Sequence, residues 1–155
     1  MKYTRLTKEQ FEELQPEFVN FLATQSITAE EWKQLKTEKP EVAEEELDLF
    51  SDLIWEGVLK KAEYLEHFSK QQLFLFKIGE TTMQLIALKV ENEAINITTK
   101  EGYQWLRDNL LHDDVTIYTS KKAISEDRNQ DIFALIKQGA NITKGELFGY
   151  FEKMV

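Results

Sequence analysis

The chain contains no cysteine and only two prolines among its 155 residues. Without cysteine it has no disulfide bonds, no thiol catalysis and no cysteine-ligated zinc or iron–sulfur site. Long apolar runs are missing as well, since runs such as residues 73–76 and 85–88 are far shorter than the roughly 20 residues that cross a bilayer. No apolar stretch typical of a signal peptide follows the first residues. We therefore expect a cytoplasmic protein that is not embedded in a membrane.

Basic residues are in the minority: 19 Lys and Arg stand against 28 Asp and Glu, and the net charge is −9. This balance disfavours a nucleic-acid partner, because such binding depends on a surplus of cations that face phosphates. Ten Phe, five Tyr and three Trp supply enough core material to argue against a disordered acidic chain. At this length we expect one globular domain over residues 1–155, which folds without a metal or cofactor.

Four threonines carry the same helix-start signal, in which an apolar residue precedes the threonine and Glu or Gln follows it by three positions. They are Thr7, Thr28, Thr98 and Thr143. With two further helix signals, at Pro40 and after Ser125, the expected helices cover residues 8–24, 29–38, 40–61, 99–111, 126–138 and 144–154. Pro16 is expected to kink or split the first of them, because proline lacks the amide hydrogen that a helix interior needs.

Segments rich in Phe, Leu, Ile and Val lie between these helices. Gln72–Ile78 and residues 83–91 flank a short Gly-Glu-Thr-Thr segment and read as a hairpin, and an earlier strand start near Tyr64 also fits. Residues 115–121 read as a third strand. The predicted class is therefore α+β, with a helical N-terminal third and a small antiparallel sheet, a hairpin plus a third strand, packed by five to six helices.

Acidic side chains gather on the helix predicted from Pro40 onward, where residues 41–56 hold seven acids and no base. One side of this helix is apolar; its members are Ala43, Leu47, Phe50, Ile54 and Val58, flanked by Leu49 and Leu53. A ladder of acids spaced four residues apart runs along the other side; it consists of Glu44, Asp48, Asp52 and Glu56. Like charges at this spacing destabilise a helix by about 0.2–0.5 kcal/mol per pair, so tertiary packing has to hold it.

Trp55 and Leu59 lie within this acidic arc. One interpretation buries both, because the helix is covered on two sides near its C-terminal end. Another leaves them exposed, as an apolar pair rimmed by carboxylates that docks a basic or amphipathic protein, and a third is a homodimer contact. The candidate interaction surface consists of Glu44, Asp48, Asp52, Trp55, Glu56 and Leu59. We expect a non-enzymatic interaction module that uses residues 41–61.

A small-ligand-binding protein or small enzyme is the alternative, with polar groups at the entrance to the first strand. These are Glu63, Tyr64, Glu66 and His67. A histidine beside a carboxylate can serve as an acid–base couple, but no nucleophile motif accompanies it. Acids on one straight helix face diverge into solvent, so we expect no metal site and assign no catalytic or cofactor-binding residue.

Several segments carry a resemblance to a known family: KYTRLTKEQF, NFLATQSITAEEW, KPEVAEEELDLFSDLIWEGVL, EYLEHFSK, TTKEGYQWL and ITKGELF. Together they resemble a family of small acidic bacterial proteins, of Bacteroidota type, defined as a domain of unknown function. The resemblance runs from Met1 to about Phe151. It implies a cytoplasmic single-domain protein and carries no activity, cofactor or catalytic residue.

Overall fold

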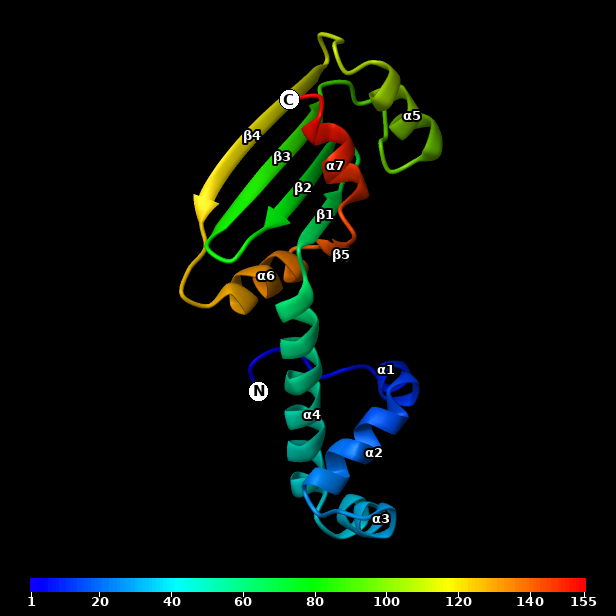
Figure 1. Cartoon of the computed structure of the whole chain (residues 1–155). Coiled ribbons are helices and arrows are strands. Elements are labelled where there is room, and N and C mark those ends of the chain that lie inside the picture. Colours follow the sequence, from blue (N-terminus) through cyan, green and yellow to red (C-terminus); the bar gives the residue numbers. More distant parts are fainter. The chain divides into compact units, whose positions relative to one another are not determined.

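A computed structural model describes every residue from Met1 to Val155. It has seven helices and one five-stranded antiparallel sheet (Figure 1), so the predicted α+β class and the helical N-terminal part are confirmed. The chain divides into two compact units, Met1–Lys60 and Lys61–Val155. The single domain expected from the sequence stays a prediction. No helix combines the length and the apolar character needed to span a membrane.

The first unit is helical. Its elements are α1 (Lys8–Glu13), α2 (Gln15–Thr24), α3 (Ala29–Glu38) and α4 (Pro40–Lys61). The expected split at Pro16 is confirmed, since this proline lies in the first turn of α2. Thr7 forms the predicted capping box with Gln10, and the Thr28 side chain accepts a hydrogen bond from the Glu31 amide. These caps fix where α1 and α3 begin.

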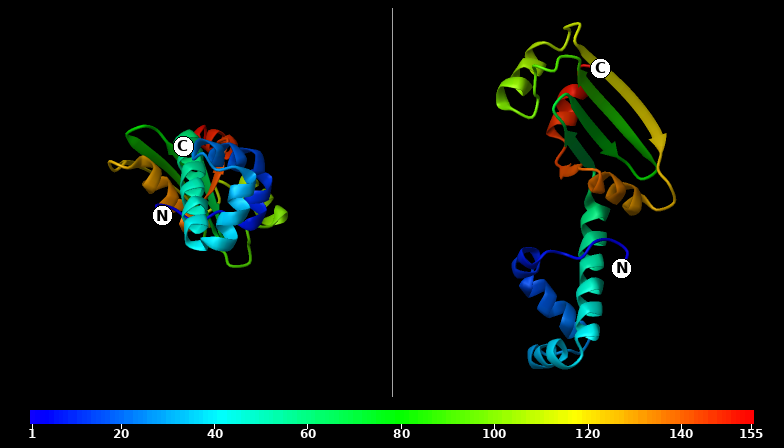
Figure 2. Two further views of the ribbon diagram at one scale, coloured as in Figure 1. Left: turned by 90° about the horizontal axis from the view of Figure 1, so that it is seen from below. Right: turned by 180° about the vertical axis from the view of Figure 1, so that it is seen from behind.

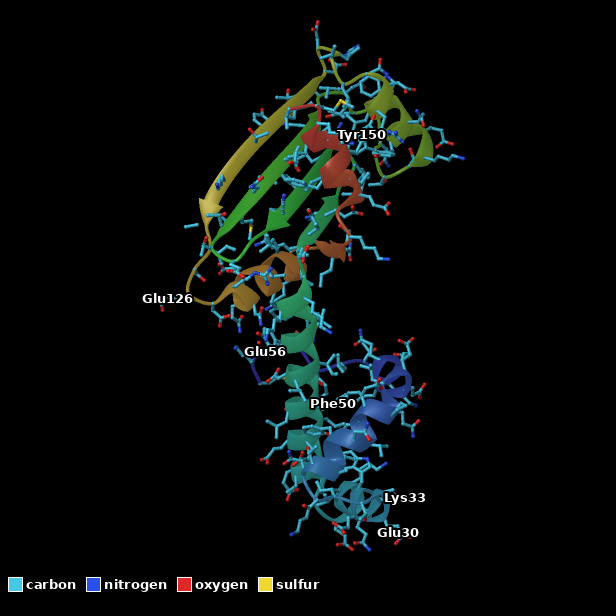
Figure 3. The ribbon with its side chains drawn as sticks, viewed as in Figure 1. Glu30, Lys33, Phe50, Glu56, Glu126 and Tyr150 are labelled. Carbon is cyan, nitrogen blue, oxygen red and sulfur yellow. The ribbon has the colours of Figure 1, made fainter.

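Aromatic packing against α4 forms the core of this unit. The ring of Phe50 lies 5.0 Å from that of Phe18 on α2 and 5.9 Å from that of Phe11 on α1. Leu6 and Leu22 complete the buried cluster. Phe50 points from α4 toward α2 (Figure 3), so this side of α4 is used for folding. The predicted apolar side of α4 is confirmed for Ala43 and Phe50, which are buried, and for Leu47 and Ile54, which pack partly buried against this cluster. It is wrong for Val58, which is 44% exposed.

The second unit contains the sheet. Its strands are β1 (Tyr64–Phe68), β2 (Gln72–Ile78), β3 (Thr82–Val90), β4 (Val115–Ala123) and β5 (Asn141–Thr143), in the order β4-β3-β2-β1-β5. The predicted hairpin joins β2 to β3. The prediction of three strands is wrong, because β1 is a separate strand and β5 pairs with it. A strand as short as β5 has no readable alternation, and only its pairing with β1 makes it a strand.

Three helices accompany the sheet: α5 (Lys100–Asp108), α6 (Arg128–Lys137) and α7 (Glu146–Glu152). Two of the predicted caps are wrong. Thr99, not Thr98, caps α5, and Gly145 with φ +84° precedes α7 in place of Thr143, which is paired in β5. The sheet pairing of Thr143 with Tyr64 therefore overrides the local cap signal.

One face of the sheet holds the core of the second unit. Leu73, Ile86 and Leu88 on this face pack with Leu106 of α5 and Phe151 of α7. Figure 1 shows α7 across this face and α6 beside one end of the sheet. In the view from behind (Figure 2), the strands lie in front of α7. Helix α7 therefore covers one face of the sheet, and α6 lies beside one end of it.

Candidate functional site

The acidic side of α4 is covered by the extended N-terminal segment, defined here as residues 2–6. The backbone amides of Lys2 and Tyr3 donate to the two oxygens of the Asp52 carboxylate, at 2.7 and 2.9 Å. The Leu6 amide donates to Ser51 Oγ at 3.0 Å, and Ser51 is fully buried. Asp52 thus accepts hydrogen bonds from two backbone amides, and the acid ladder holds the N-terminal segment against α4.

Glu56 receives two side chains from the same segment. Lys2 Nζ lies 2.6 Å from Glu56 Oε1, and the Tyr3 hydroxyl donates to the same oxygen at 2.7 Å. Both Lys2 and Glu56 remain partly exposed, so the ion pair is screened by water and contributes little by itself. Tyr3 is buried, so its ring adds apolar contact area to this end of the segment.

Arg5 bridges the two remaining acids of the ladder. Its Nε donates to Asp48 Oδ1 at 2.7 Å, and its Nη1 is hydrogen-bonded to Glu44. The hydrogen bonds with Asp48 and then with Glu44 raise the pKa of Arg5 above its ordinary value. The two carboxylates spaced one turn apart are therefore held by one guanidinium, which offsets the repulsion expected between them.

Trp55 and Leu59 do not form an exposed pair. Trp55 is half-buried; its Nε1 donates to the Thr4 carbonyl at 2.9 Å, and its ring lies 6.4 Å from that of Tyr3. Leu59 is 0% exposed. Trp55 and Leu59 are both covered in the structure, as the first interpretation expected. The interpretation as an exposed docking pair is wrong, because the N-terminal segment, about 50 residues away in sequence, lies over Trp55.

An exposed apolar stripe does exist on α4, on a different face. Leu49 and Leu53 are 54% and 57% exposed, although the sequence placed them beside the buried side. Gly57 continues their four-residue spacing, is exposed, and has no atom within 4 Å of where a β-carbon would lie. We call Leu49, Leu53 and Gly57 the leucine stripe. Its i, i+4 spacing in the sequence is the signal that could have found it.

Carboxylates border the leucine stripe. At 100° per residue, Glu46 falls close to the line of Leu53, and Glu45 falls to one side. Glu45 is exposed, and Glu46 Oε2 is shielded from solvent without a hydrogen-bond partner. Two acids that the sequence did not assign to a candidate surface therefore lie beside the leucine stripe.

The four residues of the alternative ligand site do not face one way. Tyr64 and Glu66 share one face of β1, and His67 lies on the other, because successive strand residues point to opposite faces. The Tyr64 ring packs 5.8 Å from that of Phe148, whereas His67 lies beside Gly139. A single site that joins Glu66 to His67 is therefore wrong.

Glu66 lines a small cavity of about 270 Å³ with four residues between the end of β5 and the first turn of α7, which are Thr143, Lys144, Glu146 and Leu147. Burial raises the pKa of its carboxyl. Glu63 is exposed and is not among the lining residues. The cavity is slightly smaller than typical small-molecule sites, so a ligand there would have to be small.

A cationic residue lies between two tyrosines near the same face of the sheet. The guanidinium of Arg107 lies 4.7 Å from the centre of the Tyr150 ring and 5.9 Å from that of Tyr103. Burial raises the pKa of Tyr103, and Arg107 opposes this shift. Figure 3 shows Tyr150 on α7. This arrangement joins α5 to α7 by cation–π contacts and supplies no nucleophile.

No group of three His, Asp or Glu side chains is placed to hold a metal ion. DUF6495, a family of unknown function, matches residues 1–155. The chain belongs to this family. No curated protein and no solved structure matches this DUF6495 protein. The leucine stripe of α4 is an exposed apolar surface of this protein with acids beside it.

Proposed function

We propose that this DUF6495 protein is a non-enzymatic protein-interaction module and that α4 is its contact element. The observation that carries the proposal is the exposure of Leu49 and Leu53 on a helix whose other sides are already used. Phe50 faces the core, and the acid ladder holds the N-terminal segment. Burying a leucine side chain yields about 1.5–3 kcal/mol, so two exposed leucines supply a driving force for association.

The charge of the residues beside the leucine stripe indicates which kind of partner fits. Glu45 and Glu46 lie at the N-terminal end of the leucine stripe, so a partner gains from basic side chains placed beside its own apolar residues. The contact residues of α4 form an inclined row at four-residue spacing, the kind of ridge against which a second helix packs, and this fits an amphipathic helix better than an extended peptide. The proposed partner is therefore an amphipathic helix with cations at its flanks.

A pair of synthetic peptides tests this proposal. One carries a leucine stripe flanked by lysines, and the other carries the same stripe flanked by glutamates. We expect the lysine-flanked peptide to bind in fluorescence anisotropy, with an affinity that falls as salt rises. Leu53→Glu should weaken this binding at least tenfold, because it places a charge in the apolar contact.

Leu111→Glu is the matched control, since Leu111 is fully exposed and lies outside α4. This variant makes the same chemical change at a leucine that the proposal does not use. Equal effects of Leu53→Glu and Leu111→Glu would contradict the proposal, because the peptide would then respond to net charge alone. Equal binding of the two peptides would contradict it as well.

Small-ligand binding at β1 is the second candidate function. The observation that favours it is Glu66, a carboxyl with a raised pKa that lines a cavity together with Lys144. Tyr64 lies on the same face of the strand, whereas His67 does not take part. Titration of the protein with small amines, followed by the backbone amide signals of residues 143–147 in NMR, tests this alternative. Unchanged signals at millimolar amine would exclude it.

A further inference from the structure

The leucine stripe is complementary to itself when a second helix runs in the opposite direction. Leu49 and Gly57 lie four residues before and after Leu53, and Glu46 and Lys60 lie seven residues before and after it. A two-fold axis through Leu53 therefore brings Leu49 of one copy next to Gly57 of the other, and Glu46 of one copy next to Lys60 of the other. We infer that α4 binds α4 of a second copy of this chain, antiparallel, with Leu53 on the axis. The inference rests on the proposed function of α4 and names the partner.

Gly57 leaves space for the side chain of Leu49 from the second copy. A glycine inside a helix is less favourable than alanine, because its backbone loses more freedom on folding. Nothing within the chain requires it here, since a β-carbon at Gly57 would meet no atom within 4 Å. In the antiparallel pair, Leu49 of the second copy lies over this open position. The missing side chain lets the two helices approach closely at both ends of the contact.

Charge also favours the antiparallel arrangement. The acids of α4 lie mostly in its N-terminal part, and its two bases, Lys60 and Lys61, end the helix. Antiparallel pairing places Glu46 of each copy next to Lys60 of the other, which gives two such pairs in the dimer. Parallel pairing would place acids against acids, which costs stability. A second copy therefore meets the requirement for an amphipathic helix with cations at its flank.

The contact is small. At 1.5 Å per residue the 22-residue helix is about 33 Å long, and only part of it takes part. Interfaces below the standard size are typical of weak and transient pairs. We therefore expect a dimer with a dissociation constant on the order of 10–100 µM, in exchange with the monomer.

Sedimentation equilibrium of the full chain, over roughly 5 µM to 1 mM, measures this association. We expect a reversible monomer–dimer equilibrium. Gly57→Gln should weaken this dimer at least tenfold, because the new side chain fills the space that Leu49 of the second copy occupies. Within its own chain the new side chain meets only open space. The midpoint of thermal unfolding, measured at low concentration, should not fall, and this keeps a loss of dimer separate from a loss of folding.

A charge exchange identifies the antiparallel pairing. Glu46→Lys and Lys60→Glu should each weaken self-association at least tenfold, because each places two like-charged pairs in the dimer. An equimolar mixture of the two variants should form a heterodimer about as stable as the wild-type dimer, since every pair then joins opposite charges. A partner other than a second copy would not show this rescue.

A monomer at all concentrations would overturn the inference. So would a dimer that Gly57→Gln leaves unchanged, or a mixture of charge variants that does not associate. The protein could also stay monomeric and still bind the lysine-flanked peptide at Leu53. That result would support the proposed function and reject only the second copy as the partner. Failure of both measurements would reject both.

Discussion

At the scale of single residues, the contacts of the N-terminal segment differ in what they contribute. Ser51 is fully buried, donates to the Leu47 carbonyl at 2.7 Å and accepts from the Leu6 amide at 3.0 Å. Arg5 makes more contacts with acids, yet it lies partly in solvent, where ion pairs are worth little. The buried hydroxyl is therefore expected to matter more for stability than the visible salt bridges.

Ser51→Ala should lower the free energy of unfolding by about 1–3 kcal/mol, because it leaves the buried Leu6 amide without an acceptor. Urea denaturation followed by tryptophan fluorescence measures the change. Ser120→Ala is the control, since Ser120 is exposed on β4, and we expect a change within about 0.5 kcal/mol. Equal effects of the two substitutions would show that the Leu6 amide does not depend on Ser51.

Glu66 should make stability depend on pH. Burial raises the pKa of its carboxyl in the folded state, so the folded protein binds more protons than the unfolded chain. Stability from this group is therefore present below its ordinary pKa and is lost as the pH rises through the raised value. Glu66→Gln should be more stable than wild type at pH 7 and should lose that advantage near pH 4. The free energy of unfolding is measured with denaturant at both pH values. Glu63→Gln, at an exposed neighbour, is the control and should not gain stability at pH 7 as Glu66→Gln does.

At the scale of elements, α4 carries three sides with three roles: core packing, retention of the N-terminal segment, and the exposed leucine stripe. The sequence predicted the first side from helical periodicity and located the acids correctly. It could not predict that Lys2, Tyr3 and Arg5 occupy those acids, because nothing local links residues about 50 positions apart. For the same reason it named Trp55 and Leu59 as candidates and placed Leu49 and Leu53 at the flanks of the buried side.

Gly57→Ala should raise the free energy of unfolding by about 0.5–1 kcal/mol when the protein is monomeric, because alanine restricts the unfolded backbone and meets open space in the helix. Denaturation at low micromolar concentration measures this gain. Gly102→Ala is the opposite case, since its β-carbon would lie 1.8 Å from the Asn96 carbonyl oxygen. That variant should be strongly destabilised. A loss of stability in Gly57→Ala would show that its side is not open.

At the scale of the whole molecule, the charge is unequally divided. Residues 1–60 hold 14 acids and 7 bases, and residues 61–155 hold 14 and 12, which gives −7 and −2 of the total −9. Composition identified an acidic protein, and the order of helix and strand signals predicted an α+β fold, a class that the structure confirms. The division into two units was not visible in the sequence, because α4 runs without a break up to the boundary at Lys60. The candidate contact surface belongs to the more acidic unit.

The absence of cysteine makes one direct measurement available. A thiol introduced by Leu53→Cys is the only one in the chain, so its alkylation rate reports the exposure of the leucine stripe. We expect this rate to fall as protein concentration rises or as the lysine-flanked peptide is added, while the rate for Leu111→Cys stays constant. A rate at position 53 that stays as constant as that at position 111 under both conditions would contradict the account of α4 as a contact surface.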